Sequence, residues 1–154
     1  MDTTAVWQGW YAAFEQCARD DQWERLIDLM TPDAQYRVVG APFSCVVKGP
    51  RAIADGFRRS FAGFDRRFDR RTHIVAGSRI TEPGHVAAHI WGVYEKAGLS
   101  PLAFPATGHW HVDGDRIGLM VDIYDMGLVE SQAAMLWMGE HGPALGGLDP
   151  RYAD

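Results

Sequence analysis

The chain has 154 residues, of which 47% are hydrophobic and 12% aromatic, values typical of one compact domain with a hydrophobic core. Its formal net charge of −5 argues against a surface built to hold nucleic acid or an anionic membrane, because both need an electropositive surface. The two cysteines, Cys17 and Cys45, form neither a disulfide framework nor a CxxC motif. The sequence has no signal-peptide pattern and no apolar run of membrane length, so we expect a single cytoplasmic domain over residues 1–154.

The first part of the chain has helical periodicity. Within residues 3–19, apolar side chains recur at intervals of three and four, which predicts an amphipathic helix. A second, shorter helix is expected over residues 23–30, where a Thr-Pro pair ends the pattern. A strand at 34–39 and a loop with room for a short strand follow, and Pro50 suits the first position of a third helix.

Beyond residue 68 the pattern changes to that of β-strands. Four segments rich in β-branched and aromatic residues are separated by short turn signals, at 70–80, 85–96, 101–112 and 116–125. Connections this short require antiparallel neighbours, which gives a four-stranded meander. A last helix over about 128–138 and a loose Gly/Pro-rich tail complete the chain. Helices followed by a meander predict an α+β domain with helices packed on one face of a curved sheet.

The last predicted strand carries a carboxylate among aliphatic residues. Alternation gives this strand one aliphatic side, which we expect to belong to the core: Ile117, Leu119, Val121 and Ile123. The other side is mixed and holds Gly118, Met120, Asp122 and Tyr124. Asp122 therefore either points to solvent or lines a cavity. In a cavity, desolvation would raise its pKa and make it a candidate for proton transfer.

Histidines supply further candidates, each with a structural alternative. His89 lies on a strand that is largely apolar on both sides and is expected to be buried, either as a hydrogen-bonded core residue or as a catalyst; His73 has the same two interpretations. His109 and His111 share one strand face and could reach one metal ion. A zinc-type site needs three or four ligands, however, and no third stands at motif spacing, so we expect no metal.

Two further patterns limit the chemistry. Six arginines fall within the fourteen residues 58–71, either as a solvated helix end or as a site for a carboxylate or phosphate. The sequence contains no Gly-rich phosphate loop and no GxSxG motif. Acid–base chemistry without a cofactor is the interpretation that remains.

The order of elements, and several segments within residues 3–127, resemble the nuclear-transport-factor-2-like superfamily and, within it, the SnoaL-like group. The segments are WERLIDLMTPDAQYRV, GPRAIADGF, THIVAGSRIT and HWHVDGDRIGLMVDIYD, which leaves 128–154 as a C-terminal helix and tail. The resemblance implies a cone-shaped antiparallel sheet curved around the N-terminal helices, a deep apolar pocket and a homodimer. Isomerases, cyclases, dehydratases, epoxide hydrolases and non-catalytic binders share this fold, so the fold does not fix the function.

Individual residues narrow what the resemblance implies. SnoaL-like cyclases and limonene-epoxide-hydrolase relatives carry an aspartate in the last strand, and VDIYD places Asp122 there, facing the pocket. The epoxide hydrolases also use an Arg and an Asp on the preceding strand, where this sequence has His89 and Trp91. In dehydratase-like members a histidine resembling His73 works with an aspartate before the second helix, where Arg19 stands beside two aspartates.

These observations predict a cofactor-independent enzyme that acts on a small hydrophobic, polyketide- or terpenoid-like molecule by cyclisation, isomerisation or dehydration. Asp122 would be the general acid or base, His73 or His89 would orient it or relay the proton, and a tyrosine would bind a developing oxyanion. The residues expected to bind substrate are Phe14, Tyr36, Val38, Trp91, Trp110, Met120 and Tyr124. The alternatives are an epoxide hydrolase and a non-catalytic small-molecule-binding protein whose polar network only fixes the packing.

Overall fold

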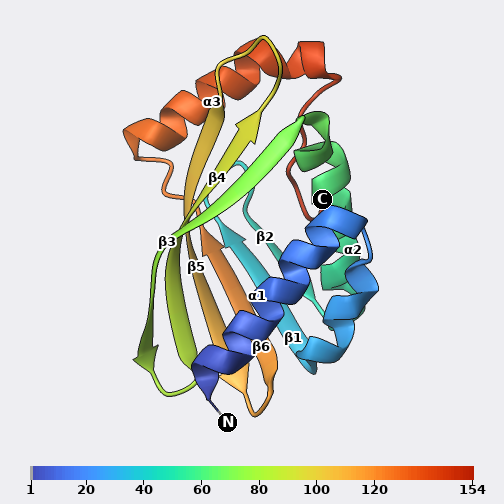
Figure 1. Cartoon of the computed structure of the whole chain (residues 1–154), viewed down its shortest axis with the longest axis vertical. Helices are drawn as coiled ribbons and strands as arrows, with labels where there is room; N and C mark the ends of the chain where they lie inside the picture. Colours follow the sequence, from blue (N-terminus) through green and yellow to red (C-terminus); the bar gives the residue numbers. More distant parts are fainter. Residues whose placement is uncertain (1) are drawn as a thin grey trace.

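A curved six-stranded sheet forms the frame of the molecule, for which a computed structural model describes residues 2–154 (Figure 1). The strands are β1 (Met30–Val39), β2 (Cys45–Lys48), β3 (Arg70–Glu82), β4 (His85–Glu95), β5 (Leu102–Asp113) and β6 (Arg116–Ile123). Their order in the sheet is β2-β1-β6-β5-β4-β3. The predicted antiparallel meander is confirmed as β3 to β6, whose short connections leave no room for a crossover.

One strand pair departs from the antiparallel pattern. β1 runs parallel to β6, in a register that places Tyr36 beside Met120 and Val38 beside Asp122. A parallel pair needs a long connection, and here the chain between the two strands includes a helix and most of the sheet. The arrangement brings side chains of β1 next to the strand that carries Asp122.

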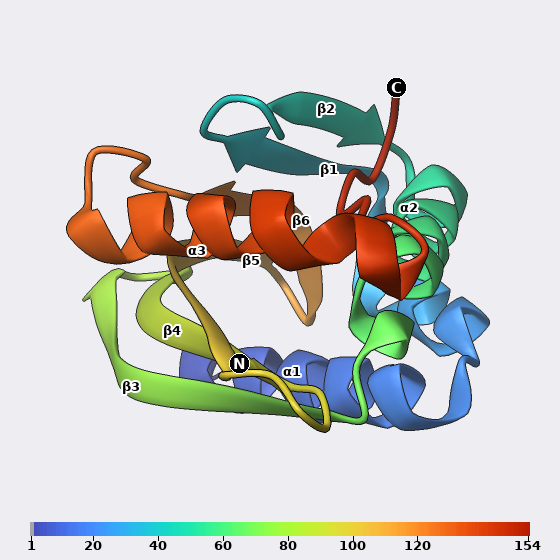
Figure 2. The ribbon, with the colours of Figure 1, turned by 90° about the horizontal axis from the view of Figure 1, so that it is seen from above.

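Three α-helices complete the predicted α+β architecture: α1 (Thr3–Asp20), α2 (Pro50–Gly63) and α3 (Val129–His141). Asp2 caps the start of α1 with its side chain, and Asp21, in the left-handed region with φ 61°, ends it. The sheet curves around α1 and α2, which close its open side, and α3 lies across one end (Figures 1 and 2). No helix within residues 2–154 combines the length and the apolar character needed to cross a membrane.

The second predicted helix is a 3-10 helix, Trp23–Leu29, and β1 begins directly after it, earlier than predicted. Trp23 and Leu26 are fully buried. A spacing of three residues matches the three residues per turn of a 3-10 helix, so both side chains reach the core from one face.

The C-terminal tail, predicted to be loose, packs along α2 instead (Figure 1). The backbone N–H of Asp149 donates to the carbonyl of Gly63, and the Ser60 hydroxyl donates to the carbonyl of Pro150. A Cβ atom at Gly63 would lie 2.4 Å from the carbonyl oxygen of Asp149, and one at Gly56 would lie 3.0 Å from that of Tyr152. The two glycines therefore form a seat for the tail.

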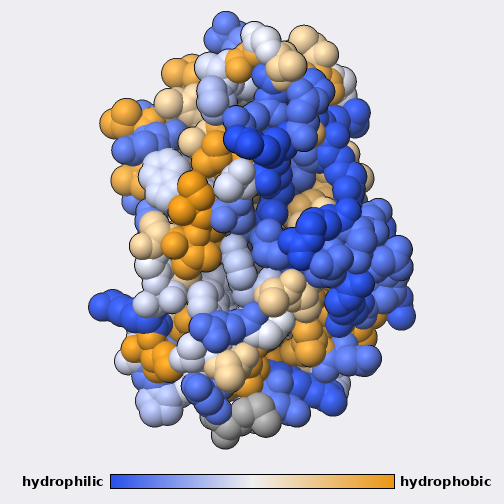
Figure 3. Space-filling view, viewed as in Figure 1, coloured by the Kyte–Doolittle hydropathy of each residue, from blue (hydrophilic) through white to orange (hydrophobic). Residues whose placement is uncertain are grey.

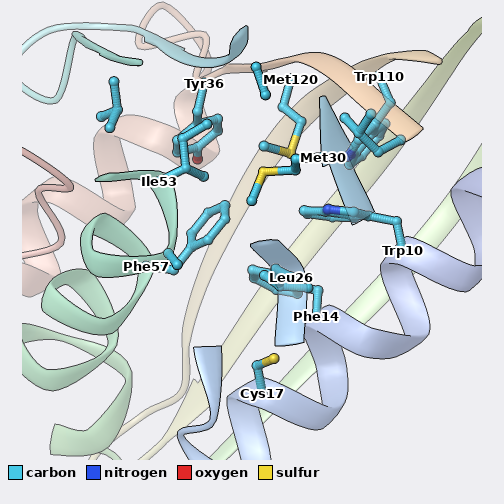
Figure 4. Packing of buried hydrophobic residues seen from close by; sticks show 14 of the residues in the cluster. Trp10, Phe14, Cys17, Leu26, Met30, Tyr36, Ile53, Phe57, Trp110 and Met120 are labelled. Carbon is cyan, nitrogen blue, oxygen red and sulfur yellow. The ribbon is translucent and has the colours of Figure 1, made fainter. Parts of the chain in front are cut away.

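The core between α1, α2 and the sheet is largely aromatic (Figure 4). Phe14 lies at its centre and contacts the rings of Trp10, Trp23, Phe57 and Phe61 at centroid distances of 5.2 to 5.8 Å. The pair with Trp10 is stacked and the other three are edge-on, and ring pairs of both kinds add to the free energy gained by burial. A second buried cluster lies under α3: Phe64, Phe68, Tyr94, Leu102, Phe104 and Ala134.

The predicted faces of the strands need correction. On β6, Met120 is only 2% exposed, whereas Ile123 on the predicted core side is 37% exposed. Ile117 is nevertheless fully buried, because a register shift between β5 and β6 leaves Gly118 without a partner and reverses the alternation there. On β4 the inward side begins at Val86, so the prediction that His89 is buried was wrong; both sides of β4 are too apolar for the pattern to choose between them.

Candidate functional site

A cavity lies between the inner face of the sheet, α1 and α2. It consists of two adjoining hollows of about 80 and 50 Å³ that share four lining residues: Asp65, Tyr94, Tyr124 and Tyr152. Aromatic side chains make up much of the wall of the larger hollow, and several of them face one another in Figure 4: Trp10, Phe14, Tyr36, Phe57 and Trp110. An apolar wall with a few polar groups is typical of a small-molecule site.

The first polar wall of the cavity is formed by Asp122 on β6 and Tyr36 on β1. The Tyr36 hydroxyl donates a hydrogen bond of 2.5 Å to Oδ2 of Asp122. Burial raises the pKa of Asp122 to about 6, and the hydrogen bond from Tyr36 only partly opposes this shift. Burial, and then the charge of Asp122, hold the pKa of Tyr36 well above its usual value. Near neutral pH Asp122 can therefore both accept and release a proton.

The second polar wall, formed by α1 and β3, contains a charged network. Nδ1 of His73 lies 3.3 Å from Oε1 of Glu15 and 3.1 Å from the Tyr11 hydroxyl. The guanidinium of Arg71 donates to both carboxylate oxygens of Glu15 at 3.2 to 3.3 Å, and its Nε lies 3.0 Å from Oδ2 of Asp65. One helical turn separates Tyr11 from Glu15, and Arg71 and His73 share a strand face, so α1 and β3 supply these four side chains, while Asp65 comes from the 3-10 turn Asp65–Arg67.

The charges in this network set the protonation states. Burial would raise the pKa of Glu15, but hydrogen bonding from His73 and the charge of Arg71 hold it at about 2. Burial, followed by the charge of Arg71, lowers the pKa of His73, so its imidazole is neutral at neutral pH. With the Nδ1 proton directed to Glu15, Nε2 is left as a proton acceptor, and none of the side-chain hydrogen bonds within residues 2–154 engages it.

Asp65 is a third carboxylate in the cavity, placed where the two hollows meet. Burial raises its pKa to about 6 although the charge of Arg71 opposes the shift. Of the two carboxylates beside Arg71, Glu15 therefore has the lower pKa and stays ionised, whereas Asp65 is partly protonated near neutral pH.

The structure brings most of the predicted site residues to the cavity wall. They are Phe14, Tyr36, His73, Trp110, Met120, Asp122 and Tyr124. Val38 is buried in the core but does not line the cavity. His89 is exposed and Trp91 is half-buried, both on the outer side of β4, and Ile90 occupies the inward position in their place. The sequence-based placement of His89 and Trp91 in the pocket was therefore wrong.

The partner of His73 also differs from the one that the resemblance implied. The position before the second helix, Arg19, hydrogen-bonds Gln16, and the two aspartates beside it pair with other arginines, Arg25 and Arg66. Glu15, one turn earlier in α1, takes that place. Sequence reasoning missed Glu15, although its spacing from Tyr11 beside the apolar stripe of α1 was a usable signal.

The arginine run divides between surface and cavity. Hydrophilic residues cover the side of the molecule where α2 lies (Figure 3), and most arginines of the run pair there with surface carboxylates. Arg71 alone among the paired members has a buried side chain, with 12% exposure. The run is therefore no continuous anion site, and one member of it belongs to the cavity.

A curved sheet around helices, with a cavity between them, defines the nuclear-transport-factor-2-like fold. Residues 7–120 match the SnoaL-like domain family, and the chain belongs to that family. A search of the curated proteins finds no match.

Solved structures share the fold at low sequence identity. A putative isomerase from Rhodopseudomonas palustris has a TM-score of 0.67 at 14% identity, over 86% of this chain and 96% of that one. An epoxide hydrolase from Mycobacterium tuberculosis, similar to limonene epoxide hydrolase, has a TM-score of 0.60 at 18% identity, over 88% and 90% of the two chains. A further M. tuberculosis protein, solved with estradiol-17beta-hemisuccinate, has a TM-score of 0.58 at 17% identity, over 77% and 92%.

Proposed function

We propose that the protein is a cofactor-independent acid–base enzyme of the cyclase, isomerase or dehydratase type, acting on a small hydrophobic molecule. The observation that carries the proposal is Asp122: a carboxyl group at the wall of an aromatic cavity, with a neutral hydrogen-bond donor as its partner and a pKa of about 6. A carboxyl group tuned toward neutral pH is suited to proton transfer.

The two polar walls suggest different roles in proton transfer. The ionised form of Asp122 removes a proton from a carbon next to a carbonyl group, and the electron pair of the C–H bond moves into an enolate. Tyr124, a half-buried tyrosine of the same cavity, would hydrogen-bond the enolate oxygen. The protonated Asp122 would then return the proton to another carbon of the enolate in an isomerisation, or give it to a departing hydroxyl group, which leaves as water. Nε2 of the neutral His73, at the opposite wall, would accept a proton from a substrate hydroxyl group. Isomerisation, aldol cyclisation and β-elimination of water all share the first step.

The lining also limits the substrate. Arg71 is the cationic side chain of the cavity wall, and it is already engaged by Glu15 and Asp65. An anionic substrate would thus meet no free counter-charge, whereas a flat neutral molecule fits the aromatic wall. This supports a neutral polycyclic or terpenoid-like ketone. The ligand of the M. tuberculosis protein of the same fold, a steroid hemisuccinate, has the same kind of flat fused rings but also a carboxylate, so it supports only the binding of the ring system.

The epoxide hydrolase alternative has less support. On β5 the residue paired with Asp122 is Gly108, and the inward residues nearby on β5 and β4 are Ala106 and Ile90. None of these can orient a water or protonate an epoxide oxygen, and the one side chain that hydrogen-bonds Asp122 within residues 2–154 is Tyr36.

The test separates binding from proton transfer. Trp10 and Trp110 line the cavity, so quenching of tryptophan fluorescence reports binding of neutral mono- to tricyclic ketones, for example 1-tetralone. Mass spectrometry of the same ketones in D₂O reports exchange of the α-protons. We expect exchange by the wild type, and a loss of about 100-fold or more in Asp122→Asn with ligand affinity retained. Asp113→Asn, at the exposed end of β5, is the matched control.

Two outcomes would contradict the proposal. If Asp122→Asn exchanged protons as fast as the wild type, Asp122 would not be the base. If the wild type bound the ketones without any exchange, the protein would be a non-catalytic binder.

A further inference from the structure

A histidine cluster lies outside the cavity, at the turn between β3 and β4, which Figure 1 shows at the end of the sheet opposite α3. The register pairs His85 with His111, and their rings stack at a centroid distance of 4.3 Å. Nε2 of His85 lies 3.0 Å from Nδ1 of His109. Three of the six histidines of the chain thus meet on the outer face of the sheet.

Glu82 adds a carboxylate to this cluster. It ends β3, and its Oε1 lies 3.8 Å from Nδ1 of His85 across the turn. One ligand atom each from Glu82, His85 and His111 can be chosen so that all lie within 4.8 Å of one another. The hairpin therefore brings two further candidate ligands, Glu82 and His85, to His111, while His109 is not a member of this set.

We propose that Glu82, His85 and His111 form a binding site for a divalent transition-metal ion of the Zn²⁺ class, independent of the proposed function of the cavity. Imidazole nitrogen and carboxylate oxygen are suitable donors for this class, and two histidines with one glutamate form a known zinc ligand set. Zinc bonds of about 2.0–2.1 Å place neighbouring tetrahedral ligands about 3.3 Å apart. The side chain of Glu82 is 67% exposed and is free to rotate into this range.

The neighbours of the cluster favour the ligand form of its histidines. If Nε2 of His85 donates its proton to His109, Nδ1 keeps a lone pair that accepts a hydrogen bond from the Thr81 hydroxyl, and Oε1 of Glu82 lies 3.8 Å from the same nitrogen. A metal ion bound at Nδ1 would take the place of the Thr81 proton. Metal-binding histidines are commonly fixed in this way through their second nitrogen. His109 would thus be a positioning residue.

A bound metal ion would stabilise the β3–β4 hairpin. The same turn is linked to the start of α1, where the backbone N–H of Gly84 donates to the Thr3 hydroxyl at 3.2 Å. Metal binding at this site would therefore hold β3, β4, β5 and α1 together, and it should raise the melting temperature of the protein.

The experiment uses untagged full-length protein with Cys45→Ser in every variant, because Cys45 is a partly accessible thiol that could bind zinc. Titration with ZnCl₂ at neutral pH, monitored by isothermal titration calorimetry, should show one ion bound per chain. His85→Gln and His111→Gln should each weaken binding by about 100-fold or more, and His109→Gln by about 10- to 100-fold. His89→Gln, on the same outer face but outside the cluster, should bind as the wild type does. Circular dichroism checks that each variant is folded.

Two results would overturn the proposal. One is zinc binding of equal affinity and stoichiometry in the wild type and the His85→Gln/His111→Gln double variant. The other is a wild type that shows neither heat of binding nor a rise in melting temperature at millimolar ZnCl₂. Co²⁺ gives an independent readout, because a nitrogen–oxygen ligand set lacks the charge-transfer absorption of a thiolate.

Discussion

The two polar walls of the cavity treat a buried carboxylate in opposite ways. Burial acts to raise the pKa of both Asp122 and Glu15. Asp122 has a neutral tyrosine as its partner and reaches a pKa of about 6, whereas Glu15 faces Arg71 and His73 and stays at about 2. The hydrogen bond from His73 and the charge of Arg71 together outweigh burial at Glu15, whereas the less exposed Asp65 stays at about 6 although it also lies beside Arg71. The Asp122 wall thus keeps a group that can exchange protons, and Glu15 is a fixed charge that orients a histidine.

The largest expected effect on stability comes from removing Arg71, the counter-charge of Glu15 and Asp65. Arg71→Met leaves Glu15 and Asp65 buried without a cation, and it should lower the free energy of unfolding by about 3–5 kcal/mol at neutral pH. Urea denaturation measures the change. Arg70→Met is the matched control, since that neighbouring side chain is 71% exposed, and it should cost less than about 1 kcal/mol. Equal stability of the two variants would show that the network does not depend on Arg71.

Removing the charge of Glu15 should have a somewhat smaller effect. Its pKa of about 2 lies below the unfolded value of about 4.3, so the ionised form stabilises the fold above pH 4.3 and this gain is lost as the pH falls toward 2. Glu15→Gln should therefore lower the free energy of unfolding by about 2–3 kcal/mol at neutral pH and by less below about pH 4. Urea denaturation across this pH range measures it. A constant difference across the range would contradict the assignment.

The sequence predicted the frame of this site better than its polar partners. The meander followed from short turns, and the position of Asp122 in the pocket followed from the family resemblance, because the alternation of the last strand left both a solvent-facing and a cavity-facing position open. The sequence did not reveal which side of β4 faces inward, because both of its sides are apolar. It also did not reveal the bulge at Gly118, which reverses the alternation of β6. The Glu15–Arg71–His73 network joins α1 to β3, and the spacing within either element alone does not reveal which residues face each other.

On the wall that carries Asp122, replacing the carboxylate by an amide should stabilise the fold, whereas the same change at Glu15 destabilises it. The folded pKa of Asp122, about 6, lies above the unfolded value of about 3.9, so ionisation destabilises the fold as the pH rises through this window. Asp122→Asn should therefore raise the free energy of unfolding by about 2 kcal/mol at neutral pH, with no gain below about pH 4. Such a gain is typical of a group kept for function at a cost in stability. A strong loss of stability would favour a structural role.

The smallest expected effect comes from displacing the C-terminal tail beside Asp122, which should change the pKa of Asp122 and not that of Glu15. The ring of Tyr152 packs edge-on against Tyr36 at 4.9 Å, and a Cβ at Gly63 would lie 2.4 Å from the tail backbone. Gly63→Ala should displace the tail and admit water beside Asp122. The pKa of Asp122 should then fall from about 6 toward its ordinary value of about 3.9, while that of Glu15 stays at about 2.

Carbon-13 NMR of the carboxyl groups follows both titrations in one sample. Gly9→Ala, in α1, is the matched control, because a Cβ there meets no atom within 4 Å. It should stabilise the protein by about 0.5–1 kcal/mol through helix propensity and leave both pKa values unchanged. If Gly63→Ala shifted the two carboxylates equally, or shifted neither, the tail would not be what keeps water from Asp122. The high pKa on that wall would then arise from the aromatic lining alone.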